Sequence, residues 1–162
     1  MAMMRVGLGV DVHAFAAPED GRRLVLGGVE VLFARGLLGH SDADVLAHAV
    51  TDALLGAAGL EDIGHYFPDT DECYRDADSI VLLREVRALV GPSWEVSNVD
   101  AVVICERPKI RDHREAMRAN LADALGVDAS RVGVRGTTSE RLGFTGRGEG
   151  IAAQAVCLLE RR

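Results

Sequence analysis

The sequence predicts an α+β fold, a two-layer sandwich in which a single mixed β-sheet carries helices on one of its faces. Five segments rich in aliphatic and β-branched residues lie between glycines or polar residues, as strands do. Three other segments carry apolar residues at steps of three and four, the period of an amphipathic helix. The order of these elements along 162 residues favours one domain, residues 1–162, with the helices on one face of the sheet.

The expected strands hold mainly valine, leucine, isoleucine and alanine, and glycine or polar residues bound each run. They are expected at residues 5–13, 22–31, 98–106, 131–138 and 151–160. Aromatic residues make up only 4% of the chain, so the core between the two layers must be aliphatic.

Three helices complete the expected fold. They are expected at residues 42–58, 78–90 and 112–126. Glycines at Gly91 and Gly126 end the second and third helices in the usual way. Ser41 and Asp44 have the S-x-x-D spacing of a capping box, which places Ser41 at the N-cap and His40 just outside the first helix.

The last expected strand, residues 151–160, is apolar on both of its faces. A strand covered by helices on one face needs apolar residues on that face alone. Two interpretations are open: a central strand buried on both faces within one chain, or a strand whose second face lies at a subunit interface around a symmetry axis.

Composition argues against several classes of protein. A net charge of −7 at pH 7 argues against a nucleic-acid partner, and no apolar run reaches the roughly 18 residues of a membrane span. The three cysteines are odd in number and lack C-x-x-C spacing, so neither a disulfide framework nor a structural zinc finger is favoured. We therefore expect a cytoplasmic protein with no nucleic-acid or membrane partner, which needs cations to help bind any phosphorylated ligand.

Residues with metal-ligating side chains gather in two expected elements. Asp11 and His13 lie two apart at a strand end, so both side chains point to one face, and His48 lies on an apolar helix. Together they match a catalytic zinc site, with three ligands and a fourth position open; a cluster of hydrogen-bonded histidines is the alternative. Asp44 and Asp52, four residues to either side of His48, would orient the imidazoles, or else cap the helix or face solvent.

Two further segments offer polar groups to a ligand. The loop after the first helix holds Asp62, Asp69 and Asp71, whose carboxylates are either solvated or suited to the hydroxyls of a polyol. Residues 136–150 are rich in glycine and small hydroxyl side chains, which leaves backbone N–H groups accessible to phosphate oxygens. The same pattern is also typical of ordinary turns.

Single charged residues near these segments add to the phosphate hypothesis. Glu140 offers a carboxylate for a hard cation, and Arg147 offers a guanidinium. Lys109 is the only lysine among 18 basic residues, and an ammonium on a flexible stem suits phosphate as a point charge. Chance retention of one lysine explains Lys109 equally well.

Five segments together carry a resemblance to a known family. They are DVHAF, GLLGHSDADVLAHAVTDALLGAAGLEDIG, FPDTD, RPK and TTSERLGFTGRGEGIA, and they closely resemble the 2-C-methyl-D-erythritol 2,4-cyclodiphosphate synthase family nearly end to end. The resemblance implies a phosphorus–oxygen lyase of the non-mevalonate route to isoprenoid precursors. Such an enzyme closes 4-diphosphocytidyl-2-C-methyl-D-erythritol 2-phosphate into 2-C-methyl-D-erythritol 2,4-cyclodiphosphate and releases CMP.

The resemblance also implies an assembly and its cofactors. It implies a homotrimer with active sites between neighbouring subunits and an apolar central channel, which would cover the second face of residues 151–160. It assigns one Zn²⁺ per subunit to Asp11, His13 and His48, and a second divalent cation, Mg²⁺ or Mn²⁺, to Glu140.

The remaining site residues follow from the same resemblance. His40 and Thr138 match positions that support the transition state. The positions implied for the methylerythritol part of the substrate and its surroundings are Ser41, Asp62, Ile63, Gly64, Phe67, Pro68, Asp69, Thr70 and Asp71. The positions implied for the cytidine and phosphates are Cys105, Pro108, Lys109, Ile110, Arg111, Thr137, Ser139, Phe144 and Arg147.

Two other functions fit parts of the pattern. A metal-dependent phosphohydrolase needs the same metal ligands but admits water to the open position, so it releases a linear phosphate instead of a ring. A non-catalytic trimer that binds an isoprenoid diphosphate in its channel would bind ligand without releasing CMP.

Overall fold

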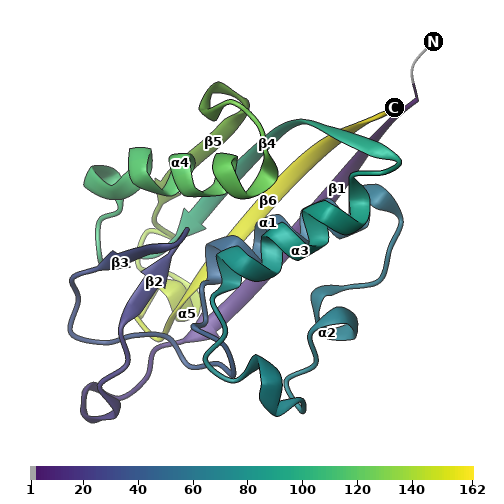
Figure 1. Cartoon of the computed structure of the whole chain (residues 1–162). Coiled ribbons are helices and arrows are strands. Elements are labelled where there is room, and N and C mark those ends of the chain that lie inside the picture. The colour runs from purple at the N-terminus through teal and green to yellow at the C-terminus, as the bar shows by residue number, and fades with distance from the viewer. Residues whose placement is uncertain (1–2) are drawn as a thin grey trace.

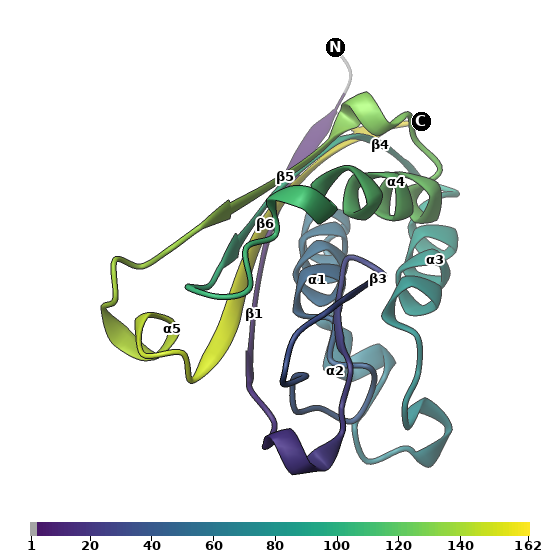
Figure 2. The same ribbon diagram turned by 90° about the vertical axis from the view of Figure 1, so that its left-hand side faces the viewer.

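The chain has the expected α+β architecture, seen in a computed structural model that describes residues 3–162 (Figure 1). A four-stranded sheet has the strand order β1-β6-β4-β5, in which β4 and β5 are parallel and the other neighbours are antiparallel. Helices α1, α3 and α4 lie on one side of this sheet (Figure 2). The prediction of a mixed sheet with helices on one face is confirmed.

Four of the five expected strands belong to this sheet. Their bounds are Met4–Ala14 for β1, Trp94–Ile104 for β4, Val132–Thr137 for β5 and Gly150–Arg161 for β6. The fifth expected strand, residues 22–31, does not join them. It divides into β2, Leu24–Leu26, and β3, Val29–Val31, which pair as a separate two-stranded sheet.

The prediction of a single sheet is therefore wrong, and the reason lies at Gly27 and Gly28. Both residues have positive φ, +56° and +70°, which reverses the chain between two short antiparallel strands. Pairs of glycines at such positions are a hairpin signal, because glycine adopts positive φ without steric cost.

The three expected helices are present with small shifts at their ends. They are α1, Val45–Ala58, α3, Ser79–Val90, and α4, Arg114–Leu125. The prediction of Ser41 as the N-cap of the first helix is wrong. Asp44 is the N-cap, and its side chain accepts the N–H of Ala47 at 2.9 Å. Ala43 has a φ of +57°, so the chain becomes helical only after it, and Ser41 Oγ instead accepts the N–H of Ala43.

Short helical turns lie in the loops and were not predicted, because three or four residues show no apolar period. The α-helical turns are α2, Ile63–Tyr66, and α5, Gly143–Gly146, and the 3-10 turns are Pro18–Asp20, Glu72–Tyr74, Arg111–His113 and Ala129–Arg131. Between residues 3 and 162, no helix has the length and apolar character needed to cross a membrane.

Helix α1 packs its backbone directly against β1. Gly7 and Gly9 point toward α1, and a Cβ on Gly7 would overlap Ala53 O, while one on Gly9 would overlap Ala49 O. Glycine is required at these positions because any side chain would push the helix away from the strand. This close approach brings the functional ends of β1 and α1 together.

The sheet face opposite the helices is open, and its β1 part is apolar. Strand β6 is central, and its alternate residues from Ile151 to Leu159 are buried against the helices, but Val156 on the other face is 42% exposed. Neighbouring β1 exposes Val6, Leu8, Val10 and Val12 on that same face, at 48–66%. A central strand buried on both faces within one chain is therefore contradicted, and coverage by other subunits stays a prediction.

Candidate functional site

Asp11, His13 and His48 converge between the end of β1 and the first turn of α1. His13 Nε2 and His48 Nδ1 lie 2.9 and 3.0 Å from the same Asp11 oxygen, Oδ2, and 3.2 Å from each other. Within residues 3–162 this is the one group of three or more His, Cys, Asp or Glu side chains arranged so that it could hold a metal ion. The group faces a cavity of about 380 Å³.

The local sequence explains why these three side chains meet. Asp11 and His13 lie on the face of β1 that Gly9 turns toward α1, as the two-residue period predicts. His48 is the fourth residue of α1, which lies against that face. The predicted convergence of the two elements is thus present in the structure, and the metal itself stays a prediction.

The hydrogen bonds of His13 fix which of its nitrogens faces the cluster as an acceptor. His13 Nδ1 lies 2.6 Å from the carbonyl oxygen of Leu38, and a carbonyl only accepts, so Nδ1 carries a proton. In the neutral ring, Nε2 then points a lone pair at the Asp11 carboxylate 2.9 Å away. Two acceptors at this distance require a proton or a cation between them, and the N/O donor set fits a zinc-type ion.

The charges in the cluster also favour a proton or a cation between Asp11 and the imidazoles. Burial opposes the ionisation of Asp11, but its interactions with the imidazoles of His13 and His48 outweigh it and lower the pKa of Asp11. Burial likewise disfavours a charged His13, but the hydrogen bond and the charge of Asp11 outweigh it and raise the pKa of His13. Both shifts favour a positive charge between Asp11 and His13, so a proton and a metal ion would compete for the same place.

Asp44 does not orient either imidazole; of the interpretations left open by the sequence, the structure shows helix capping. Its buried carboxylate accepts the N–H groups of Gly27 at 2.8 Å, Gly28 at 2.7 Å and Ala47 at 2.9 Å. Burial raises the pKa of Asp44 to about 6, against the effect of these hydrogen bonds. Asp44 thus joins the β2–β3 turn to the start of α1, so its role is structural.

Asp52 differs from both interpretations. Its carboxylate accepts the N–H of Ile63 at 2.8 Å and has no hydrogen bond to His13 or His48 in residues 3–162, so it anchors α2 beside α1. Burial raises the pKa of Asp52, and the nearby charges of Asp62 and Asp11 act in the same direction.

The cavity at the cluster contains many of the positions implied for the substrate. Besides Asp11, His13 and His48, the predicted residues that line it are His40, Ser41, Ile63, Gly64, Phe67, Pro68 and Asp69. Asp62, Thr70 and Asp71 lie outside its lining. The carboxylates of Asp62 and Asp71 cap short helical turns, accepting from His65 N and Cys73 N at 3.0 Å each.

The loop that carries His40 is held by Arg22, a residue that no sequence pattern singled out. Arg22 donates from Nε to Leu37 O at 2.6 Å and from Nη2 to Ser41 O at 2.8 Å. His40 Nε2 donates to the carbonyl oxygen of Asp71 at 2.8 Å, which joins this loop to the loop after α2. The two walls of the cavity are therefore fixed to each other.

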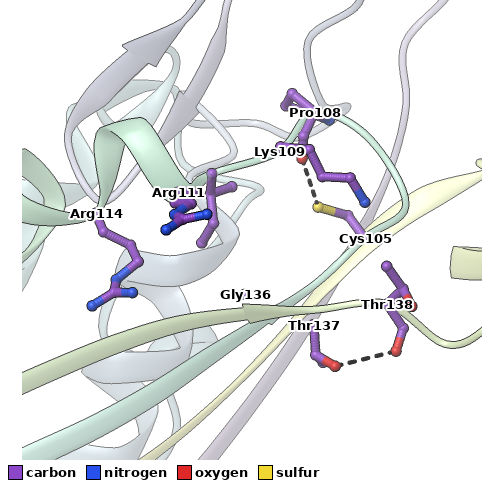
Figure 3. A pocket seen from close by; sticks show the side chains of 9 residues that line it. Cys105, Pro108, Lys109, Arg111, Arg114, Gly136, Thr137 and Thr138 are labelled. Carbon is purple, nitrogen blue, oxygen red and sulfur yellow. Dashed lines mark hydrogen bonds between the residues drawn. The ribbon is translucent and has the colours of Figure 1, made fainter.

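A second cavity, of about 240 Å³, lies where β4 and β5 end (Figure 3). Because these strands are parallel, the segment after β4 and the end of β5 meet there. The predicted residues that line it are Cys105, Pro108, Lys109, Ile110, Arg111, Thr137 and Thr138. Arg114 and Gly136 also line it and were not predicted; a Cβ on Gly136 would press against Ile110.

The remaining predicted residues follow β5 and lie outside the lining of both cavities; they are Ser139, Glu140, Phe144 and Arg147. Thr138 Oγ1 donates to Glu140 Oε1 at 3.2 Å, and Glu140 is exposed with a φ of +55°. Ser139 Oγ lies 2.7 Å from Thr145 Oγ1, and Arg147 pairs with a glutamate two residues away at 3.0 Å. Phe144 is 40% exposed. The structure of one chain therefore places His40 and Thr138 in different cavities.

The fold and the two cavities define a class of protein. Proteins of this class are α+β sandwiches. They have an Asp-His-His group of metal-ligand type in one cavity and lysine, arginine and threonine side chains around another. The YgbB family model matches residues 4–160, and the chain belongs to this family.

Named relatives match along the whole chain. The 2-C-methyl-D-erythritol 2,4-cyclodiphosphate synthase of Rubrobacter xylanophilus is 82% identical over 161 residues, 99% of this chain and 98% of the relative. The solved CDP complex of IspF from Plasmodium falciparum is 34% identical with a TM-score of 0.85, over 98% of this chain and 97% of that one. The bifunctional IspDF of Campylobacter jejuni has a TM-score of 0.94 and 42% identity; the match covers 100% of this chain and 43% of that longer one.

Proposed function

We propose that the chain converts 4-diphosphocytidyl-2-C-methyl-D-erythritol 2-phosphate to 2-C-methyl-D-erythritol 2,4-cyclodiphosphate and CMP. The observation that carries this proposal is the Asp11, His13 and His48 cluster, which opens into a cavity large enough for a small phosphorylated ligand. Membership of the YgbB family, and the name of its 82% identical relative, support the same reaction.

The reaction needs no nucleophile from the protein. An oxygen of the 2-phosphate attacks the β-phosphorus of the diphosphate, the bond from that phosphorus to the α-phosphate oxygen breaks, and CMP leaves with that oxygen. The attacking phosphate is already an anion, so the tasks left to the chain are to fold the substrate upon itself and to balance its charge. The rigid walls joined by Arg22 and His40 suit the first task.

Cations suit the second task, because the chain has a net charge of −7. We propose Zn²⁺ at Asp11, His13 and His48, and a second divalent cation, Mg²⁺ or Mn²⁺, that Glu140 shares with the diphosphate. These ions would supply positive charge to the phosphate oxygens. His40, which lines the same cavity, and Thr138, which lines the second cavity, would support the phosphates as the charge moves.

Two features support a homotrimer with sites between subunits. The open face of β1 exposes four apolar side chains in one row, a contiguous apolar patch of the kind that interaction surfaces present. The predicted site is also divided between two cavities within one chain, which a neighbouring subunit would bring together. A closed ring with the apolar faces at its axis would meet both needs.

Leu8→Asp is expected to break this assembly. A charge at the centre of an apolar interface is costly to bury, so the variant should sediment as a monomer and lose activity while keeping its helical circular dichroism. The matched control is Leu89→Asp, whose side chain is exposed on α3 at 50% and should leave the trimer intact. A wild-type chain that sediments as a monomer at micromolar concentration would contradict the trimer.

Lys109→Ala is expected to weaken CDP binding roughly 10- to 100-fold, because a hydrogen bond to a charged group contributes about 1.5–3 kcal/mol. Lys109 is exposed and lines the second cavity beside Cys105 and Thr138 (Figure 3). Isothermal titration with CDP measures the loss, and metal analysis should find zinc unchanged. Arg107→Ala, two residues away and outside that lining, is the control; an equal loss there would remove the specific role of Lys109.

Product analysis tests the function itself. The protein is incubated with the cytidylyl substrate under Zn²⁺ and Mg²⁺, and phosphorus NMR follows CMP and the cyclic diphosphate together. Equal amounts of the two products are expected. A linear phosphate would identify a phosphohydrolase, and binding without release of CMP would identify a carrier.

A further inference from the structure

The outer nitrogen of His48 faces a hydrogen-bonded pair of side chains that the proposed reaction does not use. His48 Nε2 lies 2.8 Å from Ser79 Oγ, and Ser79 Oγ in turn donates its hydrogen to Asp42 Oδ1. Ser79 is 1% exposed, although it is polar and begins helix α3. These three side chains form a line that leads away from the metal cluster into the protein.

The direction of each hydrogen bond in this line follows from the Asp42 carboxylate at its end. A carboxylate accepts, so the one hydrogen of Ser79 is directed to Asp42. The Ser79 oxygen can then only accept from His48, and the proton of the neutral imidazole must be on Nε2. His48 Nδ1 is thereby left with a lone pair directed at Asp11 Oδ2, 3.0 Å away.

We infer that Asp42 and Ser79 are positioning residues that hold His48 in the tautomer and orientation of a metal ligand; this inference rests on the proposed zinc site. The pair does for His48 what the Leu38 carbonyl does for His13, at 2.6 Å from its outer nitrogen. Metal-bound histidines commonly donate their outer N–H to a carboxylate or carbonyl in this way, and the partner raises the basicity of the ligand. Here the hydroxyl of buried Ser79 lies between the imidazole and the Asp42 carboxylate and links the two by hydrogen bonds.

The same residues also have structural contacts, which decide how the inference is tested. Asp42 accepts the N–H of Ser79 and the N–H of Asp44, each at 3.1 Å, so replacing Asp42 would disturb the starts of two helices. Ser79→Ala keeps both of those hydrogen bonds and removes only the hydroxyl. A second hydroxyl, on Ser41, lies 3.3 Å from His48 Nε2, but it accepts the N–H of Ala43 and is further away.

The experiment compares the full-length wild type, Ser79→Ala and Asp78→Ala. Asp78 is the matched control, because it caps α3 through Ile80 N at 2.9 Å and has no hydrogen bond to His48 among the described residues. Zn²⁺ affinity is measured by competition with a chromophoric chelator, and nitrogen NMR of the zinc-loaded imidazoles identifies the protonated nitrogen. We expect Ser79→Ala to bind Zn²⁺ roughly 10- to 100-fold more weakly and Asp78→Ala to bind it as the wild type does.

Each other result has a distinct meaning. Equal Zn²⁺ affinity in Ser79→Ala and the wild type overturns the inference. Equal losses in Ser79→Ala and Asp78→Ala assign the effect to the stability of α3 and overturn it too, as does a wild-type His48 protonated on Nδ1. A wild type that binds no Zn²⁺ instead refutes the proposed metal site, and with it the basis of this inference.

Discussion

Asp11→Ala is expected to lower Zn²⁺ affinity by more than about 100-fold and to abolish the cyclic product. Losing a residue that only hydrogen-bonds to a metal ligand costs roughly 10- to 100-fold in affinity, and losing a ligand itself should cost more. Asp11 is the only carboxylate in the cluster, and its Oδ2 is the atom that both imidazoles approach. Without it, two neutral nitrogens 3.2 Å apart face a cavity and hold a divalent ion weakly.

Two measurements check this expectation. Metal analysis after gel filtration gives zinc per chain, and phosphorus NMR gives the rate of cyclic product formation. Asp123→Ala is the control, because Asp123 is an exposed carboxylate on α4 that pairs with Arg84. Undiminished cyclic product from Asp11→Ala would refute the metal assignment. Full zinc occupancy with loss of activity would show that Asp11 contributes to substrate binding and not to metal binding.

The sequence predicted the centre of the site because local periods determine it. Asp11 and His13 share a face through the two-residue period of a strand, and His48 lies on an apolar helix without cationic neighbours. To predict that the three side chains converge, only the contact between β1 and α1 had to be added. Hydrophobic patterning also predicted the mixed sheet and its helical layer.

What the sequence did not predict depends on contacts between distant residues. Ser79 lies 31 residues from His48 and Asp42 lies 37 residues from Ser79, so no local pattern joins the three. The N-cap was misassigned because Ser41 and Asp44 both satisfy a capping pattern, and only the positive φ of Ala43 decides between them. In each case the deciding interaction is tertiary.

Asp44 shows why spacing alone left its role open. Its position four residues before His48 fitted a partner for the imidazole, and a helix cap was the alternative. In the structure the carboxylate faces three backbone N–H groups, including two in the β2–β3 turn, and leaves the histidine to Ser79. Spacing along a helix identifies which side chains share a face, but the neighbouring elements determine what each one contacts.

The contact between β1 and α1 gives the last prediction, Gly9→Ala. A Cβ at this position would overlap Ala49 O and lie 2.6 Å from Ala53 N, and neither backbone atom can move without moving the helix. Overpacking usually costs 1–3 kcal/mol, and we expect about 3 kcal/mol or more here because the obstacle is backbone. Ala49 follows His48 directly, so the displacement should also carry His48 away from Asp11 and weaken Zn²⁺ binding.

The matched control lies on the same helix. A Cβ on Gly56 would meet its nearest atom, Leu8 O, at 3.7 Å, an ordinary contact, so Gly56→Ala should keep or raise stability by up to about 1 kcal/mol through helix propensity. Denaturant unfolding of the metal-free chains and chelator competition measure the two effects. Wild-type stability and Zn²⁺ affinity in Gly9→Ala would show that α1 can shift without cost. If stability and affinity instead fall together, the same glycine that permits the helix–strand packing also sets the geometry of the metal site.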